Sequence, residues 1–508
     1  MIKTHDFKNI YEFLKKNSQL NYRKKFFLSL NKNEDMTYFD FLQFIECFGS
    51  FLKKNKIQKQ KKIIVIFDNS KILTLIFLSI IANYRIFVPI NPNSGRKEVE
   101  YILKNTEPSC IFIDYNLKNK FNFLPKKIKK VHIKSNNFIS FVKKFSRDKI
   151  FFGKGDNKII AQILFTSGST GDPKGVVLTH KSMLSNLYGI YNSLNIKTAE
   201  NLKFLATTPL YHNNGQFIPT LLPIIYGAST STINPETSLL TFWDTCIKLK
   251  INYSSVMATH INYFNSLPSI KKHFLKGLFC GGAKLDYAAH KKFEKKYNVK
   301  VLCNYGLTET TSIASTEGFS KNANKRGSVG KALHNNVIKI KSSKNNNFGE
   351  ILIKGENLFY GYLNKKKLTN SKIKNGWLHT GDIGFFDKNG FLNIKDRIDN
   401  MIIVSGENIY PSEIENYTSD LPRIKIGVLS YIPDKITQNK LIFIYESDSK
   451  IKYNHFYSFY KLRVSKFKIP KLIFRVDELG LKEIPKAPNK KILRSQLKKY
   501  LEKFLSNK

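Results

Sequence analysis

Strand-like segments alternate with helix-like segments along the first third of this chain, and this alternation restricts the folds that it can adopt. Lys62–Phe67 (KIIVIF) has the continuous apolar character of a strand that is buried on both faces. Ser70–Asn83 has the pattern of a helix packed on it, and Arg85–Pro89 and Ser109–Asp114 are further strands. Strands that alternate with helices form layered structures with mostly parallel sheets. We therefore predict an α/β fold.

The 508 residues exceed what one hydrophobic core supports, so at least two domains are expected. Residues 1–397 are assigned to a large multilayered domain of sheets with packed helices, and residues 398–508 to a small mobile α+β domain. Ile338–Ile353 predicts a hairpin, whereas Asn116–Lys154 predicts variable surface structure. The chain ends in an amphipathic helix, and its expected apolar face carries Leu493, Leu497, Tyr500, Leu501 and Phe504.

The formal net charge of +46 raises the question of nucleic acid or an anionic membrane as a partner. Only ten of the 84 basic residues are arginines, and the lysines are spread along the whole chain together with many Asn and Ile residues. A coding bias explains this pattern without a functional cause, and an arginine-rich arm would look different. We expect no specific nucleic-acid partner, although an anionic partner remains the alternative.

The five cysteines are not spaced like metal ligands, and their odd number fits buried thiols in a reduced cytoplasmic protein. Met1–Leu14 lacks the apolar region of a signal peptide. The most apolar segment, Ile72–Ala82, is too short to span a bilayer.

A loop of small and hydroxyl residues after the predicted strand Ile159–Phe165 is the most informative segment of the chain. Glycines let the backbone approach an anion, while hydroxyls, exposed N–H groups and a lysine can bind phosphate oxygens. Open α/β sheets bind ligands at this end of their strands. A flexible Ser/Gly turn is the alternative, and the GxxxxGK[ST] pattern is absent. The candidate phosphate-binding residues are Thr166, Ser167, Gly168, Ser169, Thr170, Gly171 and Lys174.

The full string TSGSTGDPKG (Thr166–Gly175) resembles the signature loop of the adenylate-forming superfamily, which includes the acyl-CoA synthetases. The resemblance implies that the loop holds the β- and γ-phosphates of ATP. Asn304–Glu309 (NYGLTE) resembles the YGxTE motif of the same family. There the family stacks an aromatic ring on adenine and uses a hydroxyl at the α-phosphate and a carboxylate on Mg²⁺. The resemblance assigns these roles to Tyr305, Thr308 and Glu309, and it assigns nucleotide binding to Asn304 and Gly306 as well. Without the resemblance, the Thr-Glu pair could equally form a helix cap.

Two further segments are similar to nucleotide-binding motifs of that family. Gly281–Lys284 (GGAK) resembles the turn along the adenine and acyl site, which implicates Gly282 and Ala283 unless it is a plain strand–helix turn. Trp377–Asp382 (WLHTGD) is similar to the TGD motif. The resemblance implies that Asp382 and Arg397 bind the ribose and that Asp399 is a hinge, while Asp396 stands where relatives usually have glycine.

The C-terminal segment 485–494 (PKAPNKKILR) resembles the family's catalytic motif, whose lysine is matched by Lys491. A cation is needed there because a negative carboxylate must approach a negative phosphate. Lys490 stands where relatives usually have glycine, but the spacing to Ile492 and Arg494 favours Lys491. The resemblance also implies that the small domain then rotates and brings in the loop that contains Gly406.

The acid is less well defined by the sequence. His212 matches an aromatic position that lines the site near the carboxylate in relatives, and Asn213, Asn214 and Gln216 are more polar than a fatty-acyl tunnel suggests. Phe242–Trp243 and Ser255–Thr259 are similar to segments of ligases for small polar acids such as crotonobetaine and carnitine. A medium-chain fatty acid and an aromatic acid are the alternatives.

The resemblance as a whole implies an AMP-forming acyl-CoA synthetase that uses ATP and Mg²⁺ with coenzyme A as cosubstrate. The expected partners are a small carboxylic acid, ATP and coenzyme A, and a homodimer is left open. Two alternatives remain: an enzyme that loads a carrier protein, and a nucleotide-binding relative that has lost turnover.

Overall fold

The chain divides into two compact units, one much larger than the other. The larger unit contains residues 1–339, 352–380 and 386–393. The smaller unit contains residues 340–351, 381–385 and 394–508. The C-terminal run of the smaller unit thus begins near the predicted domain boundary at residue 398, and two earlier segments join it. The computed structural model describes residues 7–147, 159–166, 173–196, 201–319, 327–342, 347–404, 407–421, 423–434, 437–486 and 492–506.

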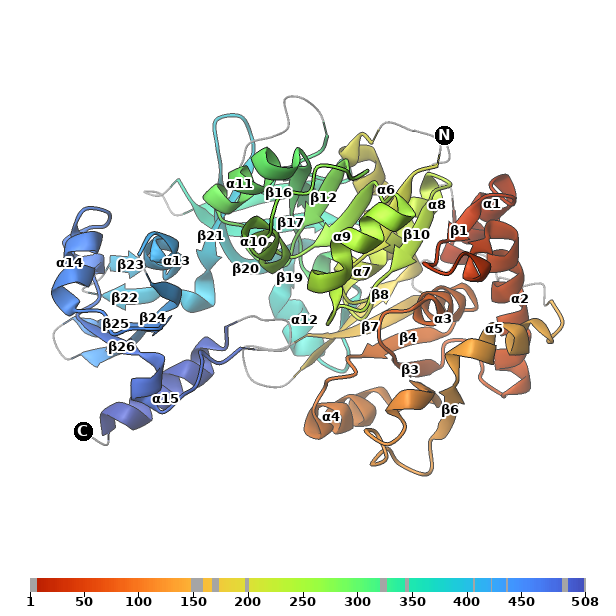
Figure 1. Cartoon of the computed structure of the whole chain (residues 1–508). Helices are drawn as coiled ribbons and strands as arrows, with labels where there is room; N and C mark the ends of the chain where they lie inside the picture. Colours follow the sequence, from red (N-terminus) through yellow and green to blue (C-terminus); the bar gives the residue numbers. More distant parts are fainter. Residues whose placement is uncertain are drawn as a thin grey trace. The chain divides into compact units, whose positions relative to one another are not determined.

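The larger unit contains two sheets that are parallel in their central strands (Figure 1). The first has the order β15–β14–β13–β12–β11–β9–β10–β1–β2, and its strands from β13 to β10 are parallel. Its strands are β1 Lys25–Phe27, β2 Met36–Thr37, β9 Lys203–Ala206, β10 Ser229–Thr232, β11 Tyr253–Val256, β12 Gly277–Cys280, β13 Lys300–Tyr305, β14 Ser315–Thr316 and β15 Lys331–Ala332.

The second sheet has the order β18–β8–β7–β4–β3–β5–β6, and β7 to β6 are parallel whereas β8 and β18 are antiparallel to their neighbours. Its strands are β3 Lys62–Ile66, β4 Ile86–Ile90, β5 Cys110–Asp114, β6 Lys129–Ile133, β7 Ile160–Thr166, β8 Lys174–Thr179 and β18 Gly361–Tyr362. The predicted strands at 62–67, 85–89, 109–114 and 159–165 are confirmed within a residue or two.

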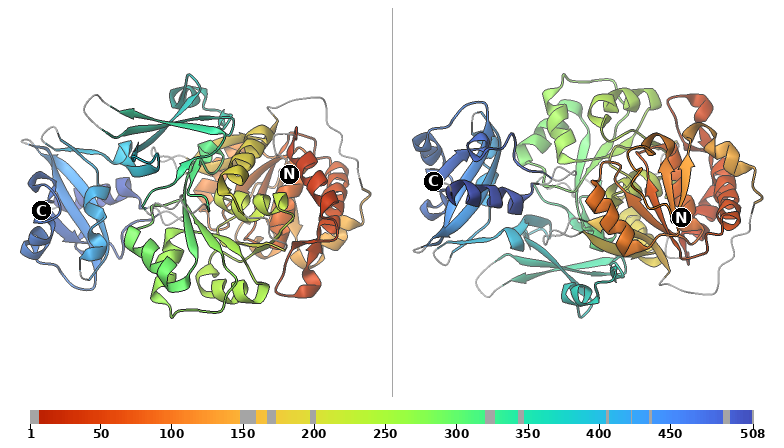
Figure 2. Two further views of the ribbon diagram at one scale, coloured as in Figure 1. Left: turned by 90° about the horizontal axis from the view of Figure 1, so that it is seen from above. Right: turned by 90° about the horizontal axis from the view of Figure 1, so that it is seen from below.

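The two sheets and their helices form five layers, because alternate side chains of each strand enter different cores. In β3, Ile63 and Val65 join the core between the sheets, whereas Ile64 and Ile66 face an outer core with α4. In β12, Phe279 faces the central core, and Leu278 and Cys280 face α9–α11. Figure 2 shows this unit from above and below. The helices are α1 Ile10–Leu20, α2 Tyr38–Lys54, α3 Lys71–Ala82, α4 Arg96–Thr106, α5 Ser135–Lys143, α6 His180–Leu194, α7 Asn213–Gln216, α8 Leu222–Ile225, α9 Ser238–Leu249, α10 Ala258–Ser266, α11 Tyr287–Tyr297 and α12 Lys366–Lys372.

Local capping explains where two of these helices begin. The Ser70 side chain accepts a hydrogen bond from the Leu73 N–H, so the residue predicted to start α3 is its N-cap. α6 begins at His180, because Thr179 and Ser182 form a reciprocal capping box.

The interpretation of Asn116–Lys154 as variable surface structure is wrong for its described part, which holds β6 and α5. Phe138 and Val142 of α5 are buried in the central core beside α2. The helix gives little periodic signal in the sequence, because only these two of its nine residues are buried.

A third sheet has the order β16–β17–β20–β19, and β21 also pairs with β20. Its strands are β16 Asn336–Ser342, β17 Gly349–Gly355, β19 Ile373–Lys374, β20 Trp377–Phe386 and β21 Leu392–Arg397. The adjacency of β16 and β17 agrees with the hairpin predicted over 338–353.

The smaller unit contains a three-stranded sheet of order β24–β25–β26 and a separate β22–β23 pair. Its further elements are β22 Ile402–Val404, β23 Glu407–Ile409, α13 Ser412–Glu415, β24 Ile424–Asp434, β25 Gln438–Ser447, α14 Tyr453–Lys461, β26 Leu472–Arg475 and α15 Arg494–Ser506. The predicted apolar face of α15 is partly wrong: Leu497 and Leu501 are buried, but Tyr500 is 37% exposed and Leu493 precedes the helix.

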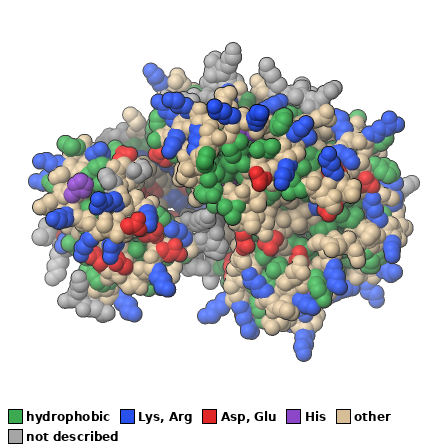
Figure 3. All heavy atoms as spheres, viewed as in Figure 1, with side chains coloured by type: hydrophobic (Ala, Val, Ile, Leu, Met, Phe, Trp, Pro, Cys, Tyr) green, Lys and Arg blue, Asp and Glu red, His purple; other side chains and the backbone are tan. Residues whose placement is uncertain are grey.

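Basic side chains are spread over the visible face of the molecule with acidic ones among them, rather than gathered in one band (Figure 3). Within the described ranges, no helix is both long and apolar enough to cross a bilayer.

Candidate active site

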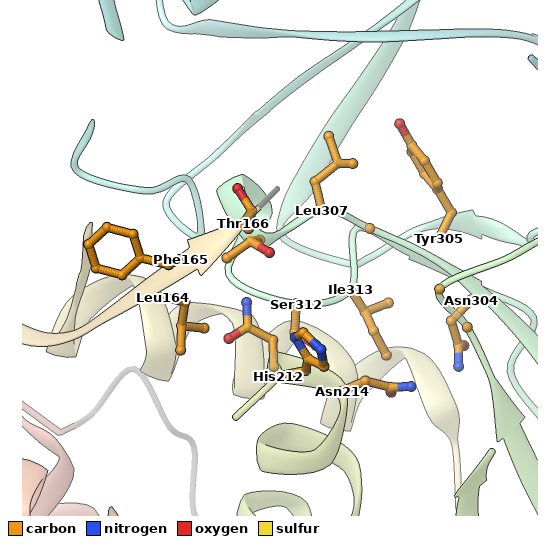
Figure 4. Close-up of a pocket in the computed structure, with 15 residues that line it drawn as sticks. Leu164, Phe165, Thr166, His212, Asn214, Asn304, Tyr305, Leu307, Ser312 and Ile313 are labelled. Atoms are coloured by element: carbon orange, nitrogen blue, oxygen red, sulfur yellow. The ribbon is translucent and has the colours of Figure 1, made fainter. Parts of the chain in front are cut away.

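A cavity of about 160 Å³ lies in the larger unit where the carboxyl ends of strands from both parallel sheets meet (Figure 4). Thr166 ends β7, Tyr305 ends β13, and Gly281 follows β12 directly. Such an edge is where open α/β sheets bind ligands. The lining residues are Leu164, Phe165, Thr166, His212, Asn213, Asn214, Gly281, Gly282, Asn304, Tyr305, Gly306, Leu307, Thr308, Ser312 and Ile313.

Seven residues that were predicted from four separate segments line this cavity together: Thr166, His212, Gly282, Asn304, Tyr305, Gly306 and Thr308. Ala283 adjoins Gly282, and Glu309 adjoins Thr308, without lining it. Sequence reasoning missed the apolar wall and Ser312, because nothing local marks Leu164, Leu307 or Ile313 as site residues.

The predicted phosphate loop is only partly described. Thr166 and Lys174 are partners across the antiparallel strands β7 and β8. Ser167, Gly168, Ser169, Thr170 and Gly171, like Gly406 and Lys491, lie outside the described residues. Their roles stay predictions.

The segment that carries Thr308 and Glu309 is closely constrained. A side chain at Gly306 would place its Cβ 1.8 Å from the Ser312 carbonyl oxygen, so only glycine fits there. Thr311 has φ +68°, a strained conformation for a β-branched residue, and its hydroxyl donates to the Asn357 carbonyl at 2.6 Å. The side-chain amide of Asn357 donates to the Thr310 carbonyl at 2.9 Å. Strain held by such bonds is typical of functional segments.

Glu309 is held from a different part of the chain. The Tyr362 hydroxyl donates to Glu309 Oε1 at 2.7 Å, and the Phe359 N–H donates to the Glu309 carbonyl at 2.8 Å. Tyr362 belongs to β18, which pairs with the strand that leaves the phosphate loop. The carboxylate that resembles a Mg²⁺ ligand is therefore oriented by a residue that the sequence did not single out.

His212 is neutral at physiological pH. His212 is an exposed residue that lines the cavity, and partial desolvation by the surrounding protein atoms lowers the pKa of its ring to about 4. Asn69 fixes this segment by donating to the Thr208 carbonyl at 2.9 Å and accepting the Leu210 N–H at 2.8 Å. Asn69 was also missed, although its place just after β3 is a signal for a polar residue at the ligand edge.

Asp382 and Arg397, the predicted ribose contacts, lie together in the smaller unit. Arg397 Nη1 is 2.8 Å from Asp382 Oδ1 and its Nη2 is 3.5 Å from Asp399 Oδ2. Asp396, at the position where the family motif usually has glycine, accepts hydrogen bonds from the Arg397 N–H, the Asn400 amide and the Ser412 N–H. The departure from the family pattern thus supplies an anchor for the turn after β21.

Phe242 and Trp243, from a segment that is similar to polar-acid ligases, do not line the cavity. Both are buried in the core against α10 and α11, where Phe242 stacks on Phe264 and Trp243 on Tyr297. Their role is in packing.

A buried carboxylate binds the backbone of the residue that precedes the cavity-lining Asn304. Glu317 is 2% exposed, and it accepts the Cys303 N–H at 3.0 Å and the Ser328 hydroxyl at 3.2 Å. Cys303 immediately precedes Asn304. Burial raises the pKa of Glu317 to about 7.

Because this folded-state pKa lies above the unfolded value of about 4.5, Glu317 contributes stability below pH ~4.5 that is lost as the pH rises through about 7. The loss is on the order of 3 kcal/mol. We expect Glu317→Gln to lose less thermal stability than the unmodified protein between pH 5 and pH 8, as followed by calorimetry. Glu98→Gln, at an exposed position, should leave the pH profile unchanged. Parallel profiles for the unmodified protein and Glu317→Gln would contradict a proton on Glu317.

The five-layered fold and a cavity shared by the GGAK and NYGLTE segments define an adenylate-forming enzyme. The model of the AMP-binding enzyme family matches residues 15–363, and the chain belongs to this family. It is an AMP-forming acid–thiol ligase of the acyl-CoA synthetase type.

Two curated relatives are 2-succinylbenzoate–CoA ligases of Bacillus cereus. One is 31% identical over 353 residues, which cover 67% of this chain and 70% of the relative. The other, from a second strain, is 26% identical over 459 residues, or 88% of this chain and 90% of the relative.

Two solved structures share the fold. The o-succinylbenzoate CoA synthetase (MenE) of Bacillus subtilis with its acyl-adenylate intermediate has a TM-score of 0.82 at 22% identity, covering 96% of this chain and 97% of that one. ATP-bound MatB of Rhodopseudomonas palustris has a TM-score of 0.83 at 20% identity, covering 93% and 95%.

Proposed function

We propose that this ligase activates 2-succinylbenzoate, an aromatic acid that also carries a ketone and a second carboxylate, and transfers it to coenzyme A. The 31% identity with a curated relative named for that acid carries the proposal. The cavity supports it, because Leu164, Leu307 and Ile313 offer apolar surface to a ring while Asn214 adds a polar side chain to the lining.

In the first half-reaction, a carboxylate oxygen of the acid attacks the α-phosphorus of ATP, the bond to the β-phosphate breaks, and pyrophosphate leaves. In the second, the thiol sulfur of coenzyme A attacks the acyl carbon, the thiol proton is released, and AMP departs with its oxygen. Neither step needs a side-chain nucleophile. Positioning and charge neutralisation therefore account for the catalysis.

The proposed contacts follow the cavity and the family resemblance. Tyr305 would stack on adenine beside Gly282 and Ala283, and Thr308 would reach the α-phosphate. The proposed phosphate contacts are Thr166, Ser167, Gly168, Ser169, Thr170, Gly171 and Lys174. In the smaller unit, Asp382 and Arg397 would hold the ribose. Neutral His212 can line the acyl path without adding a charge that would trap the carboxylate.

Glu309 fits the requirement for Mg²⁺, which would neutralise phosphate charge when bound. Within the part of the chain that the structure describes, no three His, Cys, Asp or Glu residues gather as a metal site. Mg²⁺ is commonly held by one or two carboxylates together with substrate phosphates. Glu309, with one oxygen tied to Tyr362, can supply the carboxylate.

The proposal includes a rotation of residues 398–508 about Asp399, so that Lys491 serves the first half-reaction and the loop with Gly406 the second. The Arg397–Asp399 approach of 3.5 Å and the 59% exposure of Asp399 support a hinge that makes few fixed contacts. We place the reaction in the cytoplasm, since the five cysteines are buried and free.

A panel of acids tests the function. We expect ATP–pyrophosphate exchange and coenzyme A thioester formation with 2-succinylbenzoate, and rates lower by at least about tenfold with hexanoate and carnitine, which lack the matching ring. Reactions without acid provide the background. Exchange with none of the acids would overturn the enzymatic assignment, and a preference for hexanoate or carnitine would overturn the proposed acid.

A further inference from the structure

A cluster of titratable side chains lies behind the end of β13, and none of them is among the proposed substrate contacts. They are Cys280 of β12, His290 and Glu294 of α11, Cys303 of β13 and Glu317, which follows β14. Cys280, His290 and Glu317 are each 2% exposed. An ionised group is costly in such surroundings unless it is paired, so each charge in the cluster depends on its neighbours.

Glu317 holds the strand end through its side chain. Thr316 of β14 pairs with Asn304 of β13, and the next residues along the two strands are Glu317 and Cys303. Here the Cys303 N–H donates to the Glu317 side chain, at 3.0 Å from Oε2. The other oxygen, Oε1, accepts the Ser328 hydroxyl at 3.2 Å. The carboxyl group thus joins the end of β13 to the turn before β15.

The other members of the cluster determine the charge that Glu317 carries. His290 Nδ1 is 3.9 Å from Cys303 Sγ, and His290 Nε2 is 3.3 Å from Glu294 Oε1. Burial is the largest cause that raises the pKa of Glu317 to about 7, while His290 lowers it and Glu294 raises it. Burial also raises the pKa of the Cys280 thiol to about 12 and that of Cys303 as well, so both thiols stay neutral.

This cluster adjoins the cavity directly. Asn304 and Tyr305, the two residues after Cys303, both line the cavity, and Figure 4 shows their side chains on the same strand end. Both are proposed nucleotide contacts. A bound anion such as ATP disfavours a second negative charge on Glu317, and it therefore favours the protonated carboxyl group.

We propose that Glu317, tuned by His290 and Glu294, is a proton-linked positioning residue for the nucleotide: the binding of ATP at the end of β13 is coupled to the uptake of a proton at Glu317. This rests on the proposed nucleotide contacts and deepens them. Because such coupling is reciprocal, the protonated form binds ATP more tightly, and the affinity for ATP falls as the pH rises through about 7. Glu317 acts on the nucleotide through the backbone of Cys303 and does not touch the reacting atoms.

Glu317→Gln is the sharpest test, since the amide has the shape of the protonated carboxyl group and stays neutral. Its oxygen can accept the Cys303 N–H, and its nitrogen can donate to the Ser328 hydroxyl. Between about pH 6 and pH 8.5, the Kd for ATP of the unmodified protein divided by that of the variant should rise on the order of fivefold. The variant should bind ATP more tightly at the higher pH. Calorimetric titration with ATP and Mg²⁺ measures both constants, and their ratio cancels the titration of ATP itself.

The neighbours of Glu317 give two changes with opposite expected signs. His290→Gln should move the midpoint of the affinity profile to higher pH, and Glu294→Gln should move it to lower pH, because these residues act oppositely on Glu317. Lost packing alone would not shift the midpoint in two directions. The control is Glu46→Gln, whose side chain is 12% exposed, like that of Glu294, and pairs instead with Arg147. It should leave the midpoint unchanged.

Proton uptake is measured directly by repeating the titration near pH 7 in two buffers with different ionisation enthalpies. The unmodified protein should take up more protons per ATP bound than Glu317→Gln. Thermal unfolding at each pH shows whether the variants are folded. If Glu317→Gln does not fold, the midpoints of Glu294→Gln and Glu46→Gln still decide, because unchanged midpoints in both would overturn the linkage.

The outcomes separate this coupling from the proposed function. If the unmodified protein does not bind ATP, the proposed nucleotide contacts are wrong and the coupling with them. If it binds ATP but the ratio of the Kd values stays constant with pH, Glu317 serves only the structure and the coupling alone is overturned. Equal proton uptake by the unmodified protein and Glu317→Gln would overturn it as well.

Discussion

Replacing Lys491 by alanine should reduce ATP–pyrophosphate exchange by about 10²–10³-fold, the size expected for removing one preorganised charge from a transition state. The carboxylate and the α-phosphate repel each other as they approach, and the lysine ammonium is the group proposed to bridge them. Formation of the thioester from preformed acyl-AMP should be largely retained, because the new phosphorus–oxygen bond is already made. Exchange and thioester formation are measured separately on the same preparation.

Lys490→Ala is the matched control, because it removes a neighbouring lysine of the same motif. Within the segment 485–494, Lys486 pairs with Ile492 and the Leu493 N–H donates to the Pro485 carbonyl at 2.8 Å. Arg494 then binds Glu415 with two nitrogens at 2.7 and 2.5 Å. These anchors do not involve Lys490 or Lys491, so neither substitution should unfold the smaller unit. Equal loss of both half-reactions in Lys491→Ala, or a larger loss in Lys490→Ala, would contradict the assignment.

Glu309→Gln should lower exchange by about 10²-fold and weaken the binding of ATP in the presence of Mg²⁺ but not in its absence. The physical reason is that a neutral amide is a poor ligand for a hard divalent cation. Tyr362→Phe removes the hydroxyl that donates to Glu309 Oε1 at 2.7 Å. A hydrogen bond to a charged group contributes about 1.5–3 kcal/mol, so a smaller effect of roughly tenfold in the same Mg²⁺-dependent quantity is expected.

Calorimetric titration with ATP, with and without Mg²⁺, measures this effect independently of turnover. Tyr297→Phe serves as the control, because its buried hydroxyl donates to the Phe264 carbonyl at 2.6 Å in the same unit but away from Glu309. If Tyr362→Phe and Tyr297→Phe weaken binding equally, Tyr362 has no specific role in orienting Glu309. If Glu309→Gln weakens ATP binding equally with and without Mg²⁺, Glu309 is not the metal ligand.

Elements with strong local signals were predictable from sequence. β3 is a continuous apolar run, and α3 starts at the serine that caps it, because both patterns arise from residues near one another in the chain. α5 was not predictable, since its stability comes from two side chains that enter a core built mainly by other segments. The burial of Phe242 and Trp243 in a core was not predictable for a related reason, because aromatic residues of a site and of a core look alike in sequence.

The sequence by itself determined the family motifs of this protein and hence its class of chemistry, because those motifs are contiguous runs whose residue types suit phosphate, adenine and Mg²⁺. Only the tertiary structure decided which of these residues share a cavity and which neighbours hold them. Thr166 and Asn304 line the same cavity because strands of two different sheets end at the same edge. The Tyr362 hydroxyl donates a hydrogen bond to Glu309, and the Thr316 hydroxyl donates one to Asn304. Both hydrogen bonds join residues of different strands or turns. Such contacts depend on how the layers pack, and no local pattern records that packing.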